Sequence, residues 1–105
     1  VRKVRDYLHA HAHEPIELDQ LCAVGQVPLR TLHHQFRRHF GMSPLQMLRD
    51  IRLDRARADL LRCAPGASVT GIALNWGFDH FGRFAAHYRQ RFGETPRETL
   101  RRARP

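Results

Sequence analysis

The 105-residue sequence has little cysteine, no long apolar run and few acidic residues. Its two cysteines, Cys22 and Cys63, stand too far apart for a disulfide framework or a CxxC zinc pattern, which is the usage expected in a reducing cytoplasm. No apolar run approaches the roughly 20 residues of a membrane span, and the first residues do not have the pattern of a signal peptide. We therefore expect a cytoplasmic protein with no membrane partner.

Motifs of familiar enzymes are also absent. The sequence has no GxSxG, no HExxH and no glycine-rich phosphate loop. Among its eight histidines, His9 and His13 are four residues apart with His11 between them, a spacing that can chelate a metal. No cysteine or carboxylate partner is evident, however, and Glu14-Pro15 ends the helical pattern there. We expect no catalytic residue, no metal and no cofactor.

Positive charge is abundant. Eighteen Lys+Arg against ten Asp+Glu give a formal charge of +8 and a pI near 11.2, and arginine supplies all but one of the cations. This balance is typical of proteins that bind polyanions. An arginine fork can hold a phosphate or a guanine edge with two hydrogen bonds, which a lysine ammonium cannot do. The charge indicates nucleic acid as the partner.

The hydrophobic pattern is helical throughout. Apolar residues recur at intervals of three and four, strict alternation is absent, and proline or glycine separates the periodic blocks. This pattern predicts an all-α chain. We expect about seven helices, near residues 2–12, 18–24, 28–40, 44–62, 69–76, 80–92 and from 96 onward.

Capping residues mark several helix ends. Residues 43–46 (SPLQ) and 95–98 (TPRE) are capping boxes with proline at the first helical position. Ser68 is expected to cap the fifth helix and Asp79 the sixth. Gly41 is expected to end the third helix in a left-handed conformation.

An internal repeat is the strongest feature of the sequence. Each copy contains a short helix, a turn and a longer helix, followed by glycine, a hydroxyl residue and proline. The short helices match at a spacing of 51 residues and the longer ones at 52, so the second copy has one more residue in its turn. The matched residues are Leu21, Cys22, Val27, Leu29, Leu32, Phe36, Phe40, Gly41, Ser43 and Pro44 with Ile72, Ala73, Phe78, Phe81, Phe84, Tyr88, Phe92, Gly93, Thr95 and Pro96.

A short helix packed across a longer one by a tight turn is the helix-turn-helix, whose second helix enters the major groove of DNA. We expect one helix-turn-helix subdomain at residues 1–42 and another at 63–105, joined by a linker helix at 43–62. A helix of that length is about 30 Å long, close to the roughly 34 Å between successive major-groove turns on one face of DNA. Such a linker could hold two reading helices on one duplex.

Four stretches have the order and spacing of a known family: residues 40–44 (FGMSP), 51–56 (IRLDRA), 72–73 (IA) with 77–78 (GF), and 91–96 (RFGETP). Through them, and over essentially all 105 residues, the chain resembles the DNA-binding domain of AraC/XylS-type transcriptional regulators. The resemblance implies two homeodomain-like helix-turn-helix subdomains in a bacterial regulator, usually an activator, that binds double-stranded promoter DNA and can contact RNA polymerase. It also implies an effector-binding or dimerisation domain N-terminal to Val1.

On the 28–40 helix the apolar stripe leaves the polar residues on the outward face. The N-terminal part of a recognition helix enters the groove, so Arg30, His33 and His34 are predicted to contact base edges, with Arg30 and guanine as the specific pair. The family commonly has arginine where His34 stands. For Arg38 a merely solvated position explains the sequence equally well. Phosphate contacts are assigned to Thr31, Arg37 and Arg38.

On the second recognition helix the equivalent positions are Gly82, Ala85 and Ala86, so hydrogen-bond readout there should be poor. Arg83 is the remaining candidate for a base contact. We expect the first motif to supply most of the base specificity, and the second to supply mainly phosphate anchoring, contact with thymine methyl groups or readout of DNA shape. Gly82 either permits close approach to the sugar-phosphate backbone or is simply tolerated. The backbone candidates are His80, His87 and Arg89.

Two other function classes stay open. One is a DNA-repair or methyl-acceptor protein, because an AraC-like domain can be attached to a module with a reactive cysteine, and Cys22 or Cys63 would then be the acceptor. The other is a binder of nucleic acid or anionic membranes without sequence preference, which charge alone allows. A sequence-specific binder should keep an affinity gap of about 10³-fold or more over random DNA.

Overall fold

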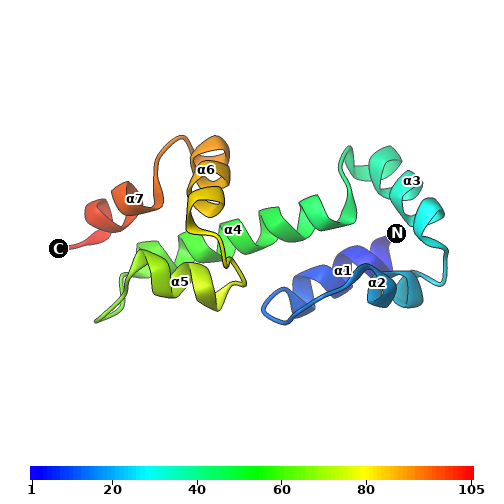
Figure 1. Ribbon diagram of the computed structural model, residues 1–105, viewed down its shortest axis with the longest axis horizontal. Helices are drawn as coiled ribbons and strands as arrows, with labels where there is room; N and C mark the ends of the chain where they lie inside the picture. Colours follow the sequence, from blue (N-terminus) through cyan, green and yellow to red (C-terminus); the bar gives the residue numbers. More distant parts are fainter. The chain divides into compact units, whose positions relative to one another are not determined.

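The computed structural model describes residues 1–105 (Figure 1). It contains seven α-helices and no strand. The predicted all-α class is confirmed. None of the helices is long and apolar enough to cross a membrane. The chain forms two compact units, Val1–Ile51 and Arg52–Pro105, which divide inside α4. The helices are α1 (Arg2–His11), α2 (Leu18–Gly25), α3 (Leu29–Phe40), α4 (Pro44–Arg62), α5 (Val69–Asn75), α6 (Phe81–Phe92) and α7 (Pro96–Ala103).

The first unit has a core of aliphatic and aromatic side chains. α1 buries Val4 and Leu8, which lie one turn apart on the same face. α3 buries Leu32 and Phe36 in the same way, and neither side chain has any exposed surface. Burying a side chain of this size contributes about 1.5–3 kcal/mol relative to leaving it in water. The core is completed by Ala12, Leu21, Leu48 and Ile51.

The second unit repeats this arrangement with more aromatic rings. α6 buries Phe84 and Tyr88, at the repeat positions of Leu32 and Phe36. The ring centroids of Phe78 and Phe84 are 4.7 Å apart, and those of Tyr88 and Phe92 are 4.6 Å apart. Such aromatic pairs add about 0.5–1.5 kcal/mol beyond the area they bury. The core is completed by Leu53, Ala56, Leu60, Ile72, Ala73 and Leu100.

α4 contributes side chains to both cores. Leu48 and Ile51 belong to the core of the first unit, whereas Leu53, Ala56 and Leu60 belong to the core of the second. The apolar residues of α4 therefore serve two separate clusters, which is why this helix has no single continuous apolar stripe in its sequence.

The predicted capping boxes are confirmed. Ser43 N donates to Gln46 Oε1 at 2.8 Å, and Gln46 N donates to Ser43 Oγ at 3.2 Å. Thr95 N donates to Glu98 Oε1 at 2.9 Å, and Glu98 N donates to Thr95 Oγ1 at 3.1 Å. Ser68 caps α5, accepting from Gly71 N at 3.0 Å. These bonds satisfy backbone N–H groups that the first turn of a helix leaves without partners.

One cap assignment was wrong, and one capping box was not predicted. Asp79 does not cap α6; the helix begins one residue later, and His80 Nδ1 accepts from Arg83 N at 3.0 Å. An aspartate and a histidine stand side by side here and both can accept such a bond, so the sequence did not decide between them. A capping box at α2 was not predicted from the sequence; there Glu17 N donates to Gln20 Oε1 at 2.6 Å.

The turns of the two motifs share a left-handed residue at the same repeat position. Gln26 has φ 56° and Gly77 has φ 83°. Glycine adopts this conformation freely, whereas for a residue with a Cβ it costs about 1–2 kcal/mol. At Gly77 a Cβ would also lie 3.4 Å from Nη1 of Arg52, at the close end of ordinary van der Waals contact. Glycine therefore suits the second turn without strain, whereas the first turn carries the backbone strain of a left-handed glutamine.

We predict that Gln26→Gly stabilises the protein by about 1 kcal/mol, because it relieves the left-handed strain at a position whose side chain is exposed. Urea denaturation followed by circular dichroism measures the change. Gly77→Ala is the matched control at the equivalent position and should destabilise the protein. A loss of stability in Gln26→Gly would show that the glutamine side chain contributes more than its backbone costs.

Candidate nucleic-acid interface

In the first motif, backbone bonds hold α2, the turn and α3 together. Gln26 N donates to Ala23 O at 3.3 Å and Val27 N to Cys22 O at 3.2 Å, so the chain turns directly after α2. α3 then starts at Leu29 and presents Leu32 and Phe36 to the core. Because helical side chains are spaced by 100°, this burial turns the positions between them toward solvent.

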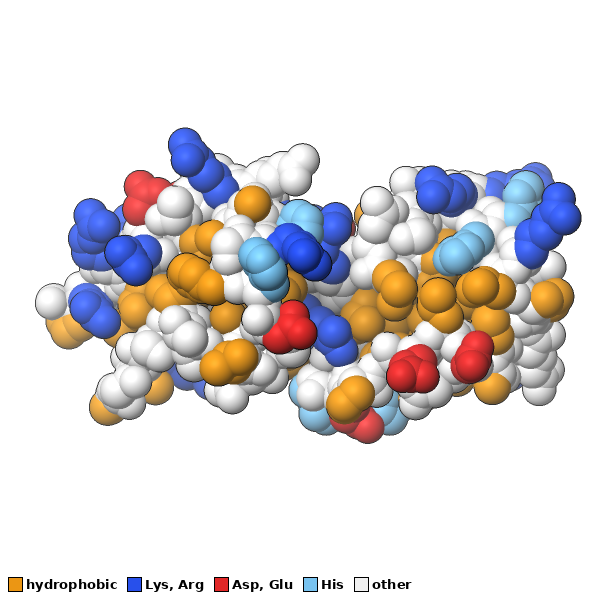
Figure 2. Space-filling model, in the orientation of Figure 1, with side chains coloured by type: hydrophobic (Ala, Val, Ile, Leu, Met, Phe, Trp, Pro, Cys, Tyr) orange, Lys and Arg blue, Asp and Glu red, His pale blue; other side chains and the backbone are white.

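The residues predicted to bind DNA on α3 lie on this outward face. Arg30, His34, Arg37 and Arg38 are exposed, and Thr31 and His33 are partly exposed. The structure gives the arginines and histidines among them no ion pair, side-chain hydrogen bond or ring contact. Figure 2 shows Lys, Arg and His side chains gathered over α3 on the face in view. His39, which was not among the predicted residues, is exposed beside Arg38 in the last turn.

Arginines on α4 differ from those on α3, because most of them contact protein groups. Arg55 lies over the Trp76 ring at 5.8 Å and Arg57 over the Phe92 ring at 5.1 Å. Arg52 is half-buried, and this burial lowers the pKa of its guanidinium. These α4 side chains pack against the second unit. The arginines of α3, in contrast, have no ion pair or ring contact within the protein.

In the second motif, Phe78 N donates to Ala73 O at 2.9 Å and closes the longer turn before α6. Arg83 and Arg89 are exposed on α6. His80 is exposed as well, but its Nδ1 is occupied by the cap, so only Nε2–H is left to donate to a phosphate. His87 is only partly exposed and already has an intramolecular partner.

Gly82 is not required by the fold. It lies within α6 at a helical conformation, and a Cβ added there would meet His80 Cε1 at 3.5 Å and Nδ1 at 3.8 Å, which are ordinary van der Waals contacts. A helix interior normally favours alanine over glycine by about 1 kcal/mol. The absence of a side chain at Gly82 therefore lets a ligand approach the backbone of α6 closely, in the N-terminal half of the second recognition helix.

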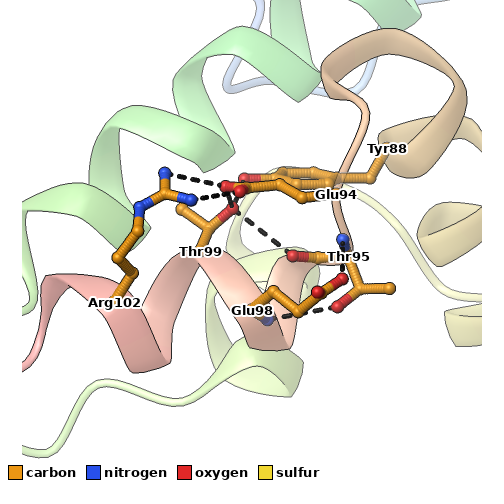
Figure 3. A network of polar contacts seen from close by, with 6 residues as sticks. All are labelled: Tyr88, Glu94, Thr95, Glu98, Thr99 and Arg102. Carbon is orange, nitrogen blue, oxygen red and sulfur yellow. Dashed lines mark hydrogen bonds and ion pairs between the residues drawn. The ribbon is translucent and has the colours of Figure 1, made fainter.

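A chain of polar contacts fixes the end of α6 to α7 (Figure 3). Tyr88 Oη donates to Thr99 Oγ1 at 2.7 Å, the hydroxyl of Thr99 donates to the carboxylate of Glu94, and Arg102 donates to the same carboxylate. Thr99 and Tyr88 are both fully buried, so their hydroxyl groups need partners within the protein. The bonds from Arg102 and Thr99 hold the pKa of Glu94 below its ordinary value.

A second contact joins α6 to α4. Arg91 donates to both carboxylate oxygens of Asp54, from Nε at 2.8 Å and from Nη2 at 3.1 Å. The two parallel bonds give this pair a defined geometry that a single bond would lack. Together with the Tyr88 chain, it holds α6 from two neighbouring helices of the second unit.

The histidines near the end of α1 form a local cluster. His11 Nδ1 lies 2.7 Å from Glu14 Oε2, and the His11 ring stacks on Tyr7 at 4.2 Å. The His11 bond lowers the pKa of Glu14. No carboxylate partner for these histidines was evident in the sequence, and Glu14 provides one. The structure brings together no group of three His, Cys, Asp or Glu side chains able to hold a metal ion.

Comparison with known proteins identifies the chain's relatives. A family model described as a helix-turn-helix domain matches residues 21–102. The probable thc operon regulatory protein of Rhodococcus erythropolis is 45% identical over 102 residues, covering 96% of this chain and 31% of that protein. The XylDLEGF operon transcriptional activator of Pseudomonas putida is 35% identical over 103 residues, covering 97% of this chain and 32% of that protein. This chain thus spans about a third of the length of these two relatives.

A solved structure matches the whole chain. The crystal structure of a probable AraC family transcriptional regulator from Rhodopseudomonas palustris CGA009 superposes with a TM-score of 0.97 at 40% identity, covering 100% of this chain and 97% of that one. Two helix-turn-helix motifs with a basic first recognition helix define a DNA-binding domain of a transcription regulator. The chain belongs to the AraC/XylS-type family of helix-turn-helix regulators. The resemblance found in the sequence is confirmed, and the names of the relatives favour a regulator over a repair protein.

We predict that Glu94→Gln lowers the free energy of unfolding at neutral pH. We also expect this free energy to fall less steeply in the variant than in the wild type as the pH is lowered. The pKa of Glu94 is lowered in the folded protein, so its contribution is present above the ordinary glutamate pKa of about 4.3 and is lost as pH falls through the lowered value. Urea denaturation at a series of pH values from neutral to about pH 3 measures both effects. Arg102→Gln is the control; in that background Glu94→Gln should change stability less, because only the bond from Thr99 is left to lose. Parallel acid curves for wild type and Glu94→Gln would contradict the prediction.

We predict that Gly82→Ala raises the stability of the protein by about 1 kcal/mol and weakens its binding to DNA. The structure accommodates the added methyl group, so any loss of affinity must come from contact with the ligand. Thermal melts and fluorescence anisotropy with a labelled duplex give the two readouts. Ala86→Gly, on the same exposed face, is the control for a simple change of helix propensity. Unchanged DNA affinity in Gly82→Ala would mean that this glycine is only tolerated.

Proposed function

We propose that this chain binds promoter DNA in the major groove with sequence preference, reading bases mainly through α3, as the DNA-binding part of a bacterial transcriptional activator. The single observation that carries the proposal is the outward face of α3. It presents Arg30, His34, Arg37 and Arg38 to solvent without intramolecular partners, while the apolar stripe behind them fixes their direction.

The roles follow from position on the helix. Arg30 and His34, with the partly exposed His33, lie in the half of α3 that enters a groove first, so they contact base edges. Thr31, Arg37 and Arg38 contact phosphates and set the register. Phosphate contacts add affinity for any DNA, and only the base contacts add preference.

The second motif has a different balance. Arg83 is the base-reading candidate on α6, and Arg89, His80 and His87 contribute to phosphate binding. Gly82 and Ala86 leave its exposed face without hydrogen-bonding groups at the remaining positions. In this proposal residues 1–42 and 63–105 carry the two reading motifs, and residues 43–62 link them.

The wider role rests on the relatives. The Pseudomonas putida protein is named a transcriptional activator and the Rhodococcus erythropolis protein an operon regulatory protein, and both are about three times as long as this chain. By analogy, we propose RNA polymerase as a further partner and an effector-binding or dimerisation domain N-terminal to Val1. A regulator of this kind acts in the cytoplasm, on the nucleoid.

Selection from a random duplex pool at near-physiological salt tests the proposal. The selected duplex and a scrambled control are then titrated against the protein. We expect the selected duplex to bind at least 10³-fold more tightly than the control. Equal affinity for both would leave a basic binder without sequence preference and would refute the proposal.

A matched pair of substitutions on α3 separates reading from anchoring. Arg30→Ala should cost roughly 5- to 150-fold with the selected duplex, and much less with the scrambled one, because a bidentate base contact is worth about 1–3 kcal/mol. Arg37→Ala should weaken binding to both duplexes by the same factor and lower the salt slope by about 1. If Arg30→Ala also weakened both equally, α3 would not be the base reader.

A further inference from the structure

An open cavity of about 630 Å³ lies in the second unit where α5, α6 and α7 meet. Three arginines line it: Arg97 and Arg101 on α7, and Arg104 directly after the helix. The hydroxyl residues Ser68 and Thr70 lie at the start of α5 on the same cavity, and no acidic residue lines it. Leu100 and Val69 provide apolar surface between these groups. The cavity is therefore lined by donors and positive charge, which favours an anion as its occupant.

These three arginines have no partner in the protein. Arg97, Arg101 and Arg104 are spaced by four and three residues, so they lie along one face of α7 and its extension. Arg102, next to Arg101 but on another face, donates to the carboxylate of Glu94. In α7 and the residue that follows it, Arg102 is thus bound to a carboxylate of the protein, whereas Arg97, Arg101 and Arg104 have no acidic partner. We call Arg97, Arg101 and Arg104 the α7 arginine row.

The position of the cavity in the motif indicates which anion fits. One wall is Phe81, the first residue of α6, and another is the start of α5. In a helix-turn-helix the second helix enters the major groove by its N-terminal end while the first crosses the DNA backbone. The cavity thus lies where the phosphates bordering the groove pass the protein. Its arginines and hydroxyls are the side chains that most often bind phosphate oxygens.

The occupant must also suit an extended row of charge. A phosphodiester backbone is a continuous line of anions, and each arginine can hold a phosphate through two hydrogen bonds. A small carboxylate would use one arginine and leave the others unpaired. Figure 2 shows that Lys and Arg side chains also gather over α7 on the face in view.

We propose that the α7 arginine row, with the hydroxyls of Ser68 and Thr70, binds the DNA phosphates that border the α6 site. This inference rests on the proposed function, because it takes α6 to be a DNA-facing helix. It assigns residues that were not predicted from the sequence. It also accounts for the poor set of base readers on α6, since the second motif would hold DNA through a sequence-independent contact made by the following helix.

Neighbouring arginines on α7 provide the test. Arg101→Gln removes a charge from the row, and Arg102→Gln removes the same charge one residue away, from the side chain bound to Glu94. We expect Arg101→Gln to weaken binding to the selected and scrambled duplexes equally, by roughly two- to fivefold. Arg102→Gln should lower the melting temperature and change DNA affinity less. Equal effects of both variants on affinity would reduce the row to a general charge effect and overturn the inference.

The triple variant Arg97→Gln/Arg101→Gln/Arg104→Gln measures how many phosphates the row binds. The slope of log affinity against log salt concentration should fall by about 0.9 for each phosphate that the variant no longer neutralises, hence by about two to three units. The melting temperature should not fall, because the three side chains have no partner in the folded protein. An unchanged slope would overturn the inference.

Two further outcomes distinguish this inference from the proposed function. If the wild-type chain shows no sequence preference but the triple variant still lowers the salt slope, the proposed function fails and the phosphate contact stands. If Arg30→Ala removes the preference as expected but the triple variant changes neither slope nor affinity, only the phosphate contact fails. A third outcome concerns a protein partner. If the row variants leave DNA binding unchanged, and an acidic peptide shifts the NMR signals of Arg101 in the wild-type protein, the cavity binds a protein and the inference is overturned.

Discussion

The burial of two side chains one turn apart in each recognition helix determines which face of that helix is exposed to solvent. In α3 these are Leu32 and Phe36, and in α6 they are Phe84 and Tyr88. An α-helix has only one face left once such a pair is packed against a core, and that face is where the polar residues stand. The turns, the caps and the supporting helices all act on this orientation. Without the packed stripe, the arginines of α3 would have no fixed direction.

The two copies of the motif achieve this orientation by different chemistry. Phe36 is wholly apolar and needs only apolar neighbours, which the first unit supplies from α1, α2 and α4. Tyr88 stands at the same repeat position but carries a hydroxyl that must be satisfied when it is buried. The Tyr88 hydroxyl donates to Thr99, and the Thr99 hydroxyl donates to the carboxylate of Glu94. Arg102 donates to the same carboxylate and balances its charge. The second copy therefore depends on α7 in a way the first copy does not depend on any following helix.

Local signals in the sequence carried most of the fold. Capping boxes, glycine at helix ends and the apolar spacing depend on residues within one or two turns of each other, and a single chain shows them directly. The internal repeat added information over a longer range, because the position of the first motif predicted the position of the second. At α6 the local rule was ambiguous, since Asp79 and His80 are both able to cap, and the structure selects His80.

Pairing between distant side chains could not be predicted in the same way. Arg101 and Arg102 are neighbours, and nothing in the sequence distinguishes them. In the fold, Arg102 donates to Glu94, whereas Arg101 lines the open cavity. Arg91 likewise finds Asp54 from 37 positions away. The outward direction of Arg30 and His34 was predictable because it depends only on helical spacing. Helical spacing does not determine how the DNA lies against α3, so it does not place each side chain on a particular base pair.

The sharing of α4 between two cores has a consequence for how the chain loses its structure. Leu48 and Ile51 complete one core, and Leu53 and Leu60 complete the other, on a single hydrogen-bonded helix. Loss of helical structure at Leu48 and Ile51 removes packing from the first core, and loss at Leu53 and Leu60 removes it from the second. The two cores therefore adjoin on α4 between Ile51 and Leu53, and this stretch of helix is the place through which loss of structure in one unit would pass to the other.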